Sequence, residues 1–228
     1  MYVLTTIMGV VNGVPTPLIW LLSNSRTERN YVHVFNMLKY PTKNRLHTVA
    51  IIGDFEQALM SAAREAFPES IYVGDLFHLL QANRRWLTSN KIKDDASEIV
   101  REIKSLWACG SIMEFEAGLG KFREKWKPIH PSFLGYFERV WINMYPPDIW
   151  ASFSRSAMDL PSGDQVLESW HRRFRDFVQK HPKEKLDSLV TDLFQEWLSY
   201  SVLLDTPHLL LDRLKDRDKS SKRAKRDT

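Results

Sequence analysis

Carboxylate and imidazole side chains occur in two places in this chain at spacings suited to metal binding or acid–base chemistry. Asp54 and Asp75 each follow a glycine that ends a short apolar run, and His78 lies three residues after Asp75. Glu168 and His171 repeat the acid-x-x-His spacing much further along the chain. At this spacing a carboxylate and an imidazole share one face of a helix. Such a pair can bind a metal ion or orient a catalytic base.

The segments around Asp54 and Asp75 predict a strand–helix–strand unit. Residues 49–52 and 71–73 are short apolar runs, which predicts two strands. Residues 55–67 between them have the apolar spacing of a helix. Strands joined in this way are parallel. Both aspartates would then lie at the carboxyl edge of one sheet, where ligands gather in open α/β proteins.

Structural roles compete with these chemical ones. Asp54 could serve only as the N-cap of the helix that follows it, a position that aspartate favours. The Asp75–His78 and Glu168–His171 pairs could each be a local hydrogen bond between surface groups. Repeated acid-x-x-His pairs also occur in di-iron helical bundles, but those need further glutamates on facing helices, and Asp75 ends a strand here.

The remaining elements surround this unit with a hairpin and helices. Residues 2–11 and 14–22 predict two strands joined by the turn Asn12-Gly13. Ser25 and Glu28 have the spacing of a capping box, which predicts a helix from there to about Leu38. A mixed sheet is therefore expected. Helices are predicted near 76–88, 95–108, 111–127, 132–145, 164–180 and 184–204, with a proline-containing loop over 146–164.

Composition limits the class of protein. The 228 residues suit one domain or one domain with an inserted subdomain, and 43% are hydrophobic, which is enough for a core. A single cysteine, Cys109, excludes an intrachain disulfide and has no basic neighbour to activate it. No apolar run reaches the roughly 18 residues needed to cross a bilayer. We expect an intracellular protein without a membrane partner.

The positive charge of the chain is concentrated at its end. Residues 215–228 hold seven Lys or Arg and three Asp, so they account for the whole net charge of +4. This segment could be a nuclear import signal or an arm that binds nucleic acid, or only a solubilising terminus. A second basic run follows His171; it could lie along phosphates or be a solvated face balanced by Asp164 and Asp176. The candidate nucleic-acid-binding residues are Arg172, Arg173, Arg175, Lys222, Arg223, Lys225 and Arg226.

The joint order of these motifs resembles the catalytic core of Mutator-like (MULE) transposases, of the ribonuclease-H-like superfamily. The resemblance extends over about residues 4–195 and depends on the order of the segments more than on any one of them. The matching segments are 7–22, 27–38, the strand–Asp–helix unit 51–68, Asp75 to His78 with Gln81, 133–141, and Glu168 to His171 followed by His181-Pro182.

The resemblance implies a fold, a reaction and roles for the candidate residues. The fold would be an α/β ribonuclease-H-like mixed sheet with a large all-helical insertion between the second and third acidic residues. By position, Asp54 is the second catalytic acid and Glu168 the third, while Asp75, His78 and His171 are accessory. In such cores an Asp-Asp-Glu set holds two divalent ions, Mg²⁺ or Mn²⁺, roughly 4 Å apart, for in-line attack on a DNA phosphodiester.

Two departures from the family pattern bear on activity. The matching residues begin downstream of the family's first aspartate, so we expect an N-terminally truncated core whose sheet lacks its first strand. Gly163-Asp164-Gln165 stands where the family has Thr-Asn-Asn. The expected protein is a transposon-derived core fragment, ancestrally active in metal-dependent DNA cleavage and strand transfer and inactive alone. The alternative is a non-enzymatic DNA-binding or regulatory protein on the same scaffold.

Four parts are expected along the chain. The sheet portion of the core would span 1–90, the helical insertion 91–160, the last helices of the core 161–205, and a basic disordered tail 206–228. DNA is the expected partner, a homo-oligomer is compatible with the sequence, and the expected location is the nucleus.

Overall fold

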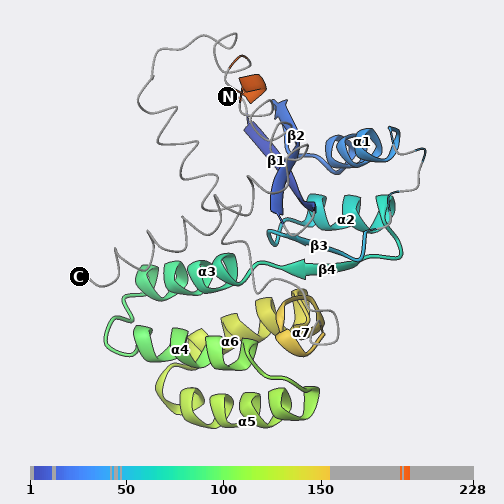
Figure 1. The fold of residues 1–228 in the computed structure, drawn as a ribbon. Coiled ribbons are helices and arrows are strands. Elements are labelled where there is room, and N and C mark those ends of the chain that lie inside the picture. Colours follow the sequence, from blue (N-terminus) through green and yellow to red (C-terminus); the bar gives the residue numbers. More distant parts are fainter. Residues whose placement is uncertain are drawn as a thin grey trace, which may run out of the picture. The chain divides into compact units, whose positions relative to one another are not determined.

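The part of the chain that the structure describes is mixed α/β and mostly helical, with two small sheets. The structure is a computed structural model that describes residues 3–11, 14–41, 43, 46, 48–154, 191 and 193–195. Residues 3–23, with β1 and β2, belong to one compact unit, and residues 26–154 belong to another (Figure 1). No helix among the described residues is long and apolar enough to span a membrane.

The first unit contains the predicted hairpin. Strands β1 (Val3–Val11) and β2 (Val14–Ser23) pair antiparallel from Val11 opposite Val14 to Val3 opposite Ser23. The register shifts between Ile7 and Met8, where Met8 faces Pro17, and proline has no N–H to donate to a ladder. Among the described strands β1 and β2 pair only with each other, so the expected mixed sheet is not seen; two separate sheets are present.

Helix α1 (Glu28–Lys39) opens the second unit. Its N-cap is Thr27, whose side chain accepts a hydrogen bond from the Asn30 amide at 3.3 Å. The capping box predicted at Ser25 is therefore wrong by two residues, because a second residue suited to capping lies directly before the helix. The apolar side chains Tyr31, Val34 and Phe35, at helical spacing, are buried. The helix ends just before Pro41.

A parallel strand pair lies at the centre of this unit. Strand β3 (Ala50–Gly53), helix α2 (Gln57–Ala66) and strand β4 (Ile71–Gly74) follow in the predicted order. β3 and β4 pair in parallel, with Gly53 opposite Gly74 at their carboxyl ends. Helices α1 and α2 lie side by side, and β3 and β4 lie between them and the remaining helices (Figure 1).

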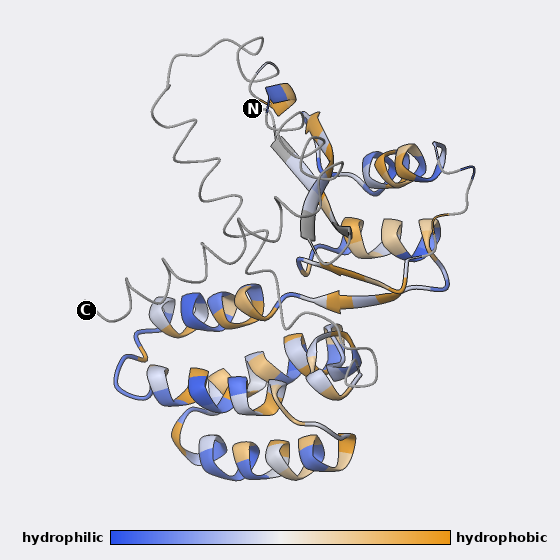
Figure 2. Ribbon diagram, in the orientation of Figure 1, coloured by the Kyte–Doolittle hydropathy of each residue, from blue (hydrophilic) through white to orange (hydrophobic). Residues whose placement is uncertain are grey.

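The rest of the unit is helical. The predicted helix over 132–145 is two elements, because its second half is a π-helix, and the predicted loop after 146 contains a short helix and a 3-10 turn. Figure 2 shows hydrophilic and hydrophobic residues on opposite faces of these helices. The elements are α3 (Leu76–Ser89), α4 (Ala96–Trp107), α5 (Ile112–Ile129), α6 (Pro131–Phe137), π-helix η1 (Glu138–Met144), α7 (Pro147–Trp150) and η2 (Ser152–Ser154).

Aromatic side chains form the core of the helical part. Trp126, Phe133, Phe137, Trp141 and Trp150 are each at most 2% exposed. Their rings pack mainly edge-on or tilted, which suits the charge distribution of aromatic faces and edges. Trp126 and Trp141 therefore pack inside the helical part.

Candidate carboxylate and histidine site

The parallel pair β3–β4 brings Asp54 and Asp75 to the same edge of the sheet. Gly53 and Gly74 are partners in the register, and each aspartate is the next residue. The amide of Asp75 donates to the Gly53 carbonyl at 2.9 Å, so the pairing continues one residue beyond the strands. The expected position of each aspartate at the carboxyl end of a strand is confirmed, and the two strand ends are neighbours.

Asp75 is a buried carboxylate that holds His78. Its side chain is 1% exposed and caps helix α3, accepting a hydrogen bond from the His78 amide at 2.9 Å. The same oxygen, Oδ1, lies 3.1 Å from His78 Nδ1. With the proton on Nδ1, the imidazole donates to this carboxylate, which fixes both the tautomer and the ring orientation. The local hydrogen bond of the structural alternative is present, but it does not join two surface groups, because Asp75 is buried.

Asp54 approaches the same imidazole from β3. Its Oδ1 lies 3.2 Å from His78 Nδ1, and its side chain is 48% exposed. Helix α2 begins at Gln57 with Glu56 in the N-cap position, so the alternative in which Asp54 only caps this helix is wrong. One imidazole nitrogen therefore lies between a buried carboxylate and a half-exposed one.

Tyr72 fixes the backbone at Asp54. Its hydroxyl donates to the Asp54 carbonyl at 2.5 Å. Burial raises the pKa of Tyr72 well above its usual value, and the negative charge of Asp54 raises it further, so the hydroxyl remains a donor. A side chain at Gly53 would bring a Cβ within 2.7 Å of this hydroxyl. Glycine at the end of β3 thus leaves room for the tyrosine.

Glu56, the next acidic residue, is held by Tyr31 of α1 and by Arg26, the first residue of this unit. Its Oε2 accepts a hydrogen bond from the Tyr31 hydroxyl at 3.2 Å and lies 3.9 Å from Arg26. Burial, followed by the charge of Glu56, raises the pKa of Tyr31 to about 12. Glu56 is therefore engaged in pairing with α1 rather than with His78.

The other predicted site residues lie outside the residues that the structure describes. The pairing of Asp54 with Glu168 stays a prediction, and so does the accessory role of His171. The predicted nucleic-acid contacts that also lie there are Arg172, Arg173, Arg175, Lys222, Arg223, Lys225 and Arg226.

The described part of the chain contains no group of three or more His, Cys, Asp or Glu placed to hold a metal ion. Asp54 could serve as a single carboxylate ligand, because it is half-exposed and its carboxylate contacts His78. Carboxylate ligands of metal ions are commonly oriented by hydrogen bonds to neighbouring groups in this way. Asp75 fits the supporting role, because its carboxylate is buried against the imidazole. The predicted division between Asp54 as ligand and Asp75–His78 as support is compatible with this geometry.

Two features of the site were not predicted from the sequence. The direct contact between Asp54 and His78 depends on how far the loop after β3 reaches across to α3. The hydrogen bond from the Tyr72 hydroxyl to the Asp54 carbonyl depends on the direction in which the pleat of β4 points the Tyr72 side chain. The repeated Gly-Asp ending of the two strands was the available signal, and it indicated only that the residues share an edge.

Comparison with known proteins adds no family assignment. A scan against protein-family models finds no match, and a search of curated proteins finds no significant match.

Proposed function

We propose that this chain is a domain derived from the catalytic core of a Mutator-like transposase, ancestrally a metal-dependent DNA-cleaving and strand-transferring enzyme. The observation that carries the proposal is the meeting of Asp54 with the Asp75–His78 pair at the carboxyl edge of a parallel strand pair. This arrangement agrees with the chain order of the sequence resemblance. The ribonuclease-H-like fold is part of the same proposal.

We also propose that the chain alone does not cleave DNA. Two-metal phosphodiester chemistry needs several carboxylates that can face the ions together. Of the three acids near the strand edge, Asp75 is buried against His78, and Glu56 is paired with Tyr31 and Arg26. Asp54 is then the one of these three placed to face a metal ion, and Glu168 is the proposed second ligand.

A nicking assay tests this. The purified full chain is incubated with supercoiled plasmid and Mg²⁺ or Mn²⁺, with Asp54→Asn as the control that removes one carboxylate charge. We expect no metal-dependent nicking above the level of the Asp54→Asn variant. Nicking by the unaltered chain that Asp54→Asn abolishes would contradict the proposed inactivity and support a working nuclease.

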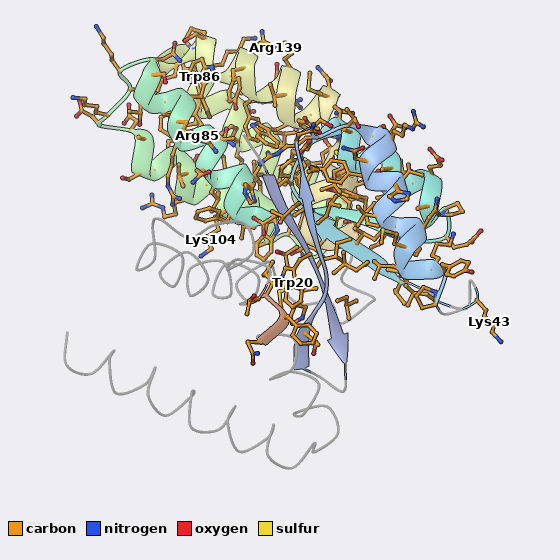
Figure 3. All side chains as sticks on the ribbon, turned by 90° about the horizontal axis from the view of Figure 1, so that it is seen from above. Trp20, Lys43, Arg85, Trp86, Lys104 and Arg139 are labelled. Carbon is orange, nitrogen blue, oxygen red and sulfur yellow. The ribbon has the colours of Figure 1, made fainter. Side chains whose placement is uncertain are left out.

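A specific surface favours DNA binding without catalysis as the second candidate function. Helix α3 carries the exposed Arg84 and Arg85 and has no acidic residue from Leu76 to Ser89. Trp86 stacks on Tyr136 with ring centroids 4.9 Å apart. Figure 3 shows Arg85, Trp86 and Arg139 toward one side of the helical part. Arginine beside aromatic rings suits contact with a nucleic-acid strand.

The charges of this surface act on Tyr136. Burial raises the pKa of Tyr136, and the positive charges of Arg139 and Arg85 act in the opposite direction. Arg85 also donates a hydrogen bond to the Gln81 side chain, which lies one turn earlier in α3, between Arg85 and His78 in the sequence. The surface therefore continues along α3 toward the carboxylate site.

Binding to a fluorescent oligonucleotide, measured by anisotropy over a range of salt concentrations, tests the second candidate. Replacing both Arg85 and Arg139 with Ala should weaken binding and lower the salt slope by about 1 for each phosphate that the protein no longer binds. The matched control replaces the exposed Lys121 and Lys127 of α5 with Ala, which removes the same charge elsewhere. Equal effects of the two double variants would contradict a binding surface on α3.

A further inference from the structure

Phe55, the residue after Asp54, extends from the strand edge into the helical part of the same unit. Its ring lies edge-on to Trp141 at 4.8 Å and to Tyr145 at 5.1 Å between centroids. On its other side the ring lies against Gly74, where an added Cβ would overlap the ring carbons. A glycine at the end of β4 therefore admits the ring between the strand and the π-helix.

The backbone of the same loop is held by two tyrosine hydroxyls. Tyr145 donates to the Phe55 carbonyl at 2.7 Å, and Tyr72 donates to the preceding carbonyl, that of Asp54, at 2.5 Å. Tyr72 comes from β4, whereas Tyr145 directly follows η1. Consecutive carbonyls of the loop are thus fixed from the sheet and from the helical part.

The end of η1 is itself anchored. Trp150 is fully buried, and its Nε1 donates to the carbonyls of Trp141 at 2.9 Å and Tyr145 at 3.1 Å. These are the two residues whose rings contact Phe55. Departures from α-helical geometry of this kind often occur at functional sites. The chain of contacts runs from Trp150 through Trp141 and Tyr145 to the loop that carries Asp54.

We propose that η1 and α7 brace the loop 54–56, with Phe55 and Tyr145 as positioning residues for the Asp54 carboxylate. The importance of this brace for chemistry rests on the proposed function, in which Asp54 faces a metal ion. The brace itself is a mechanical connection between the helical part and the strand edge, and it exists whether or not the chain acts on DNA.

Hydrogen exchange and histidine spectra of the isotopically labelled full chain test the brace without metal or DNA. The reporters are the Met60 amide, which bonds the Glu56 carbonyl, and the Asp75 amide, which bonds the Gly53 carbonyl. Tyr145→Phe removes one hydrogen bond but keeps the ring. A net hydrogen bond of about 1 kcal/mol corresponds to about fivefold faster exchange at these amides. The ring signals of His78 should shift in the same variant.

Two further variants make the result specific. Phe55→Leu should produce a larger effect on the same reporters, because it removes the ring contacts to Trp141 and Tyr145. Phe122→Leu is the control: Phe122 is a buried aromatic residue of the helical part that contacts the rings of Phe133 and Phe137. We expect Phe122→Leu to leave the His78 signals in place.

Unchanged Met60 and Asp75 exchange and unchanged His78 signals in both Tyr145→Phe and Phe55→Leu would overturn the brace. Equal changes in the Phe122→Leu control would also overturn it, because they would reflect general loss of stability. A negative nicking assay leaves this experiment unaffected, so failure of the brace and failure of the proposed function are distinguishable.

Discussion

Replacing Asp75 with alanine should destabilise the fold more than the loss of an ordinary helix cap. The side chain caps α3 through the His78 amide and contacts His78 Nδ1 while it is 1% exposed. Loss of a cap costs about 0.5–2 kcal/mol. Loss of a hydrogen bond to a charged group costs about 1.5–3 kcal/mol. We therefore expect a loss of about 2–5 kcal/mol in the free energy of unfolding.

A comparison of variants separates the cap from the contact with the imidazole. Asp75→Asn keeps an effective cap and removes only the negative charge, so it should cost about half as much. Ser111→Ala is the matched control, because Ser111 caps α5 by accepting from the Glu114 amide without a histidine partner. Its loss should cost about 1 kcal/mol.

Urea unfolding monitored by tryptophan fluorescence measures these differences, provided that the slopes with denaturant agree among the variants. The remaining contact of His78 with the half-exposed Asp54 is screened by solvent and should not compensate. If Asp75→Ala costs no more than Ser111→Ala, the imidazole contact does not stabilise the fold and the reasoning is refuted.

Three other predictions follow from individual contacts. Glu102→Ala should lower the free energy of unfolding in urea by about 1–3 kcal/mol, because it leaves the buried Trp126 Nε1 without its acceptor. Lys125→Ala should lower it by under about 1 kcal/mol, and equal losses in the two variants would refute this prediction. The pKa of Tyr31 is raised from 10.0 to about 12, so the tyrosine ionises first in the unfolded state, and the free energy of unfolding should fall as the pH rises from 10 to about 12. Tyr31→Phe should reduce this fall, and an unchanged fall would count against the prediction. Burial and Glu114 raise the pKa of Cys109, so iodoacetamide at pH 8 should label it more slowly than after unfolding, and equal rates would contradict this.

Local elements were predictable because their signals lie within a few residues. The Gly-Asp endings of β3 and β4 and the apolar spacing of α1 to α5 indicated their positions within about two residues. The π-helix η1 was not predictable in this way, because its change in hydrogen-bond register leaves the apolar spacing almost the same as in an α-helix. The cap at Thr27 was missed because Ser25 has the same chemistry two residues earlier.

The site was predictable only to the level of shared position. Parallel strands place Asp54 and Asp75 at one edge, and this follows from the strand–helix–strand order alone. The burial of Asp75, the approach of Asp54 to His78 and the insertion of Phe55 beside Gly74 depend on contacts between segments far apart in the chain. Local sequence patterns do not encode such contacts individually.

Paramagnetic broadening by Mn²⁺ tests the central claim most directly, namely that Asp54 faces a divalent metal ion together with Glu168. The measurement follows the amide spectrum of the labelled full chain during a Mn²⁺ titration. The account predicts broadening concentrated at residues 53–56 and His78, and its loss in both Asp54→Asn and Glu168→Gln. Broadening centred elsewhere, or unchanged in both variants, would contradict the proposed metal site.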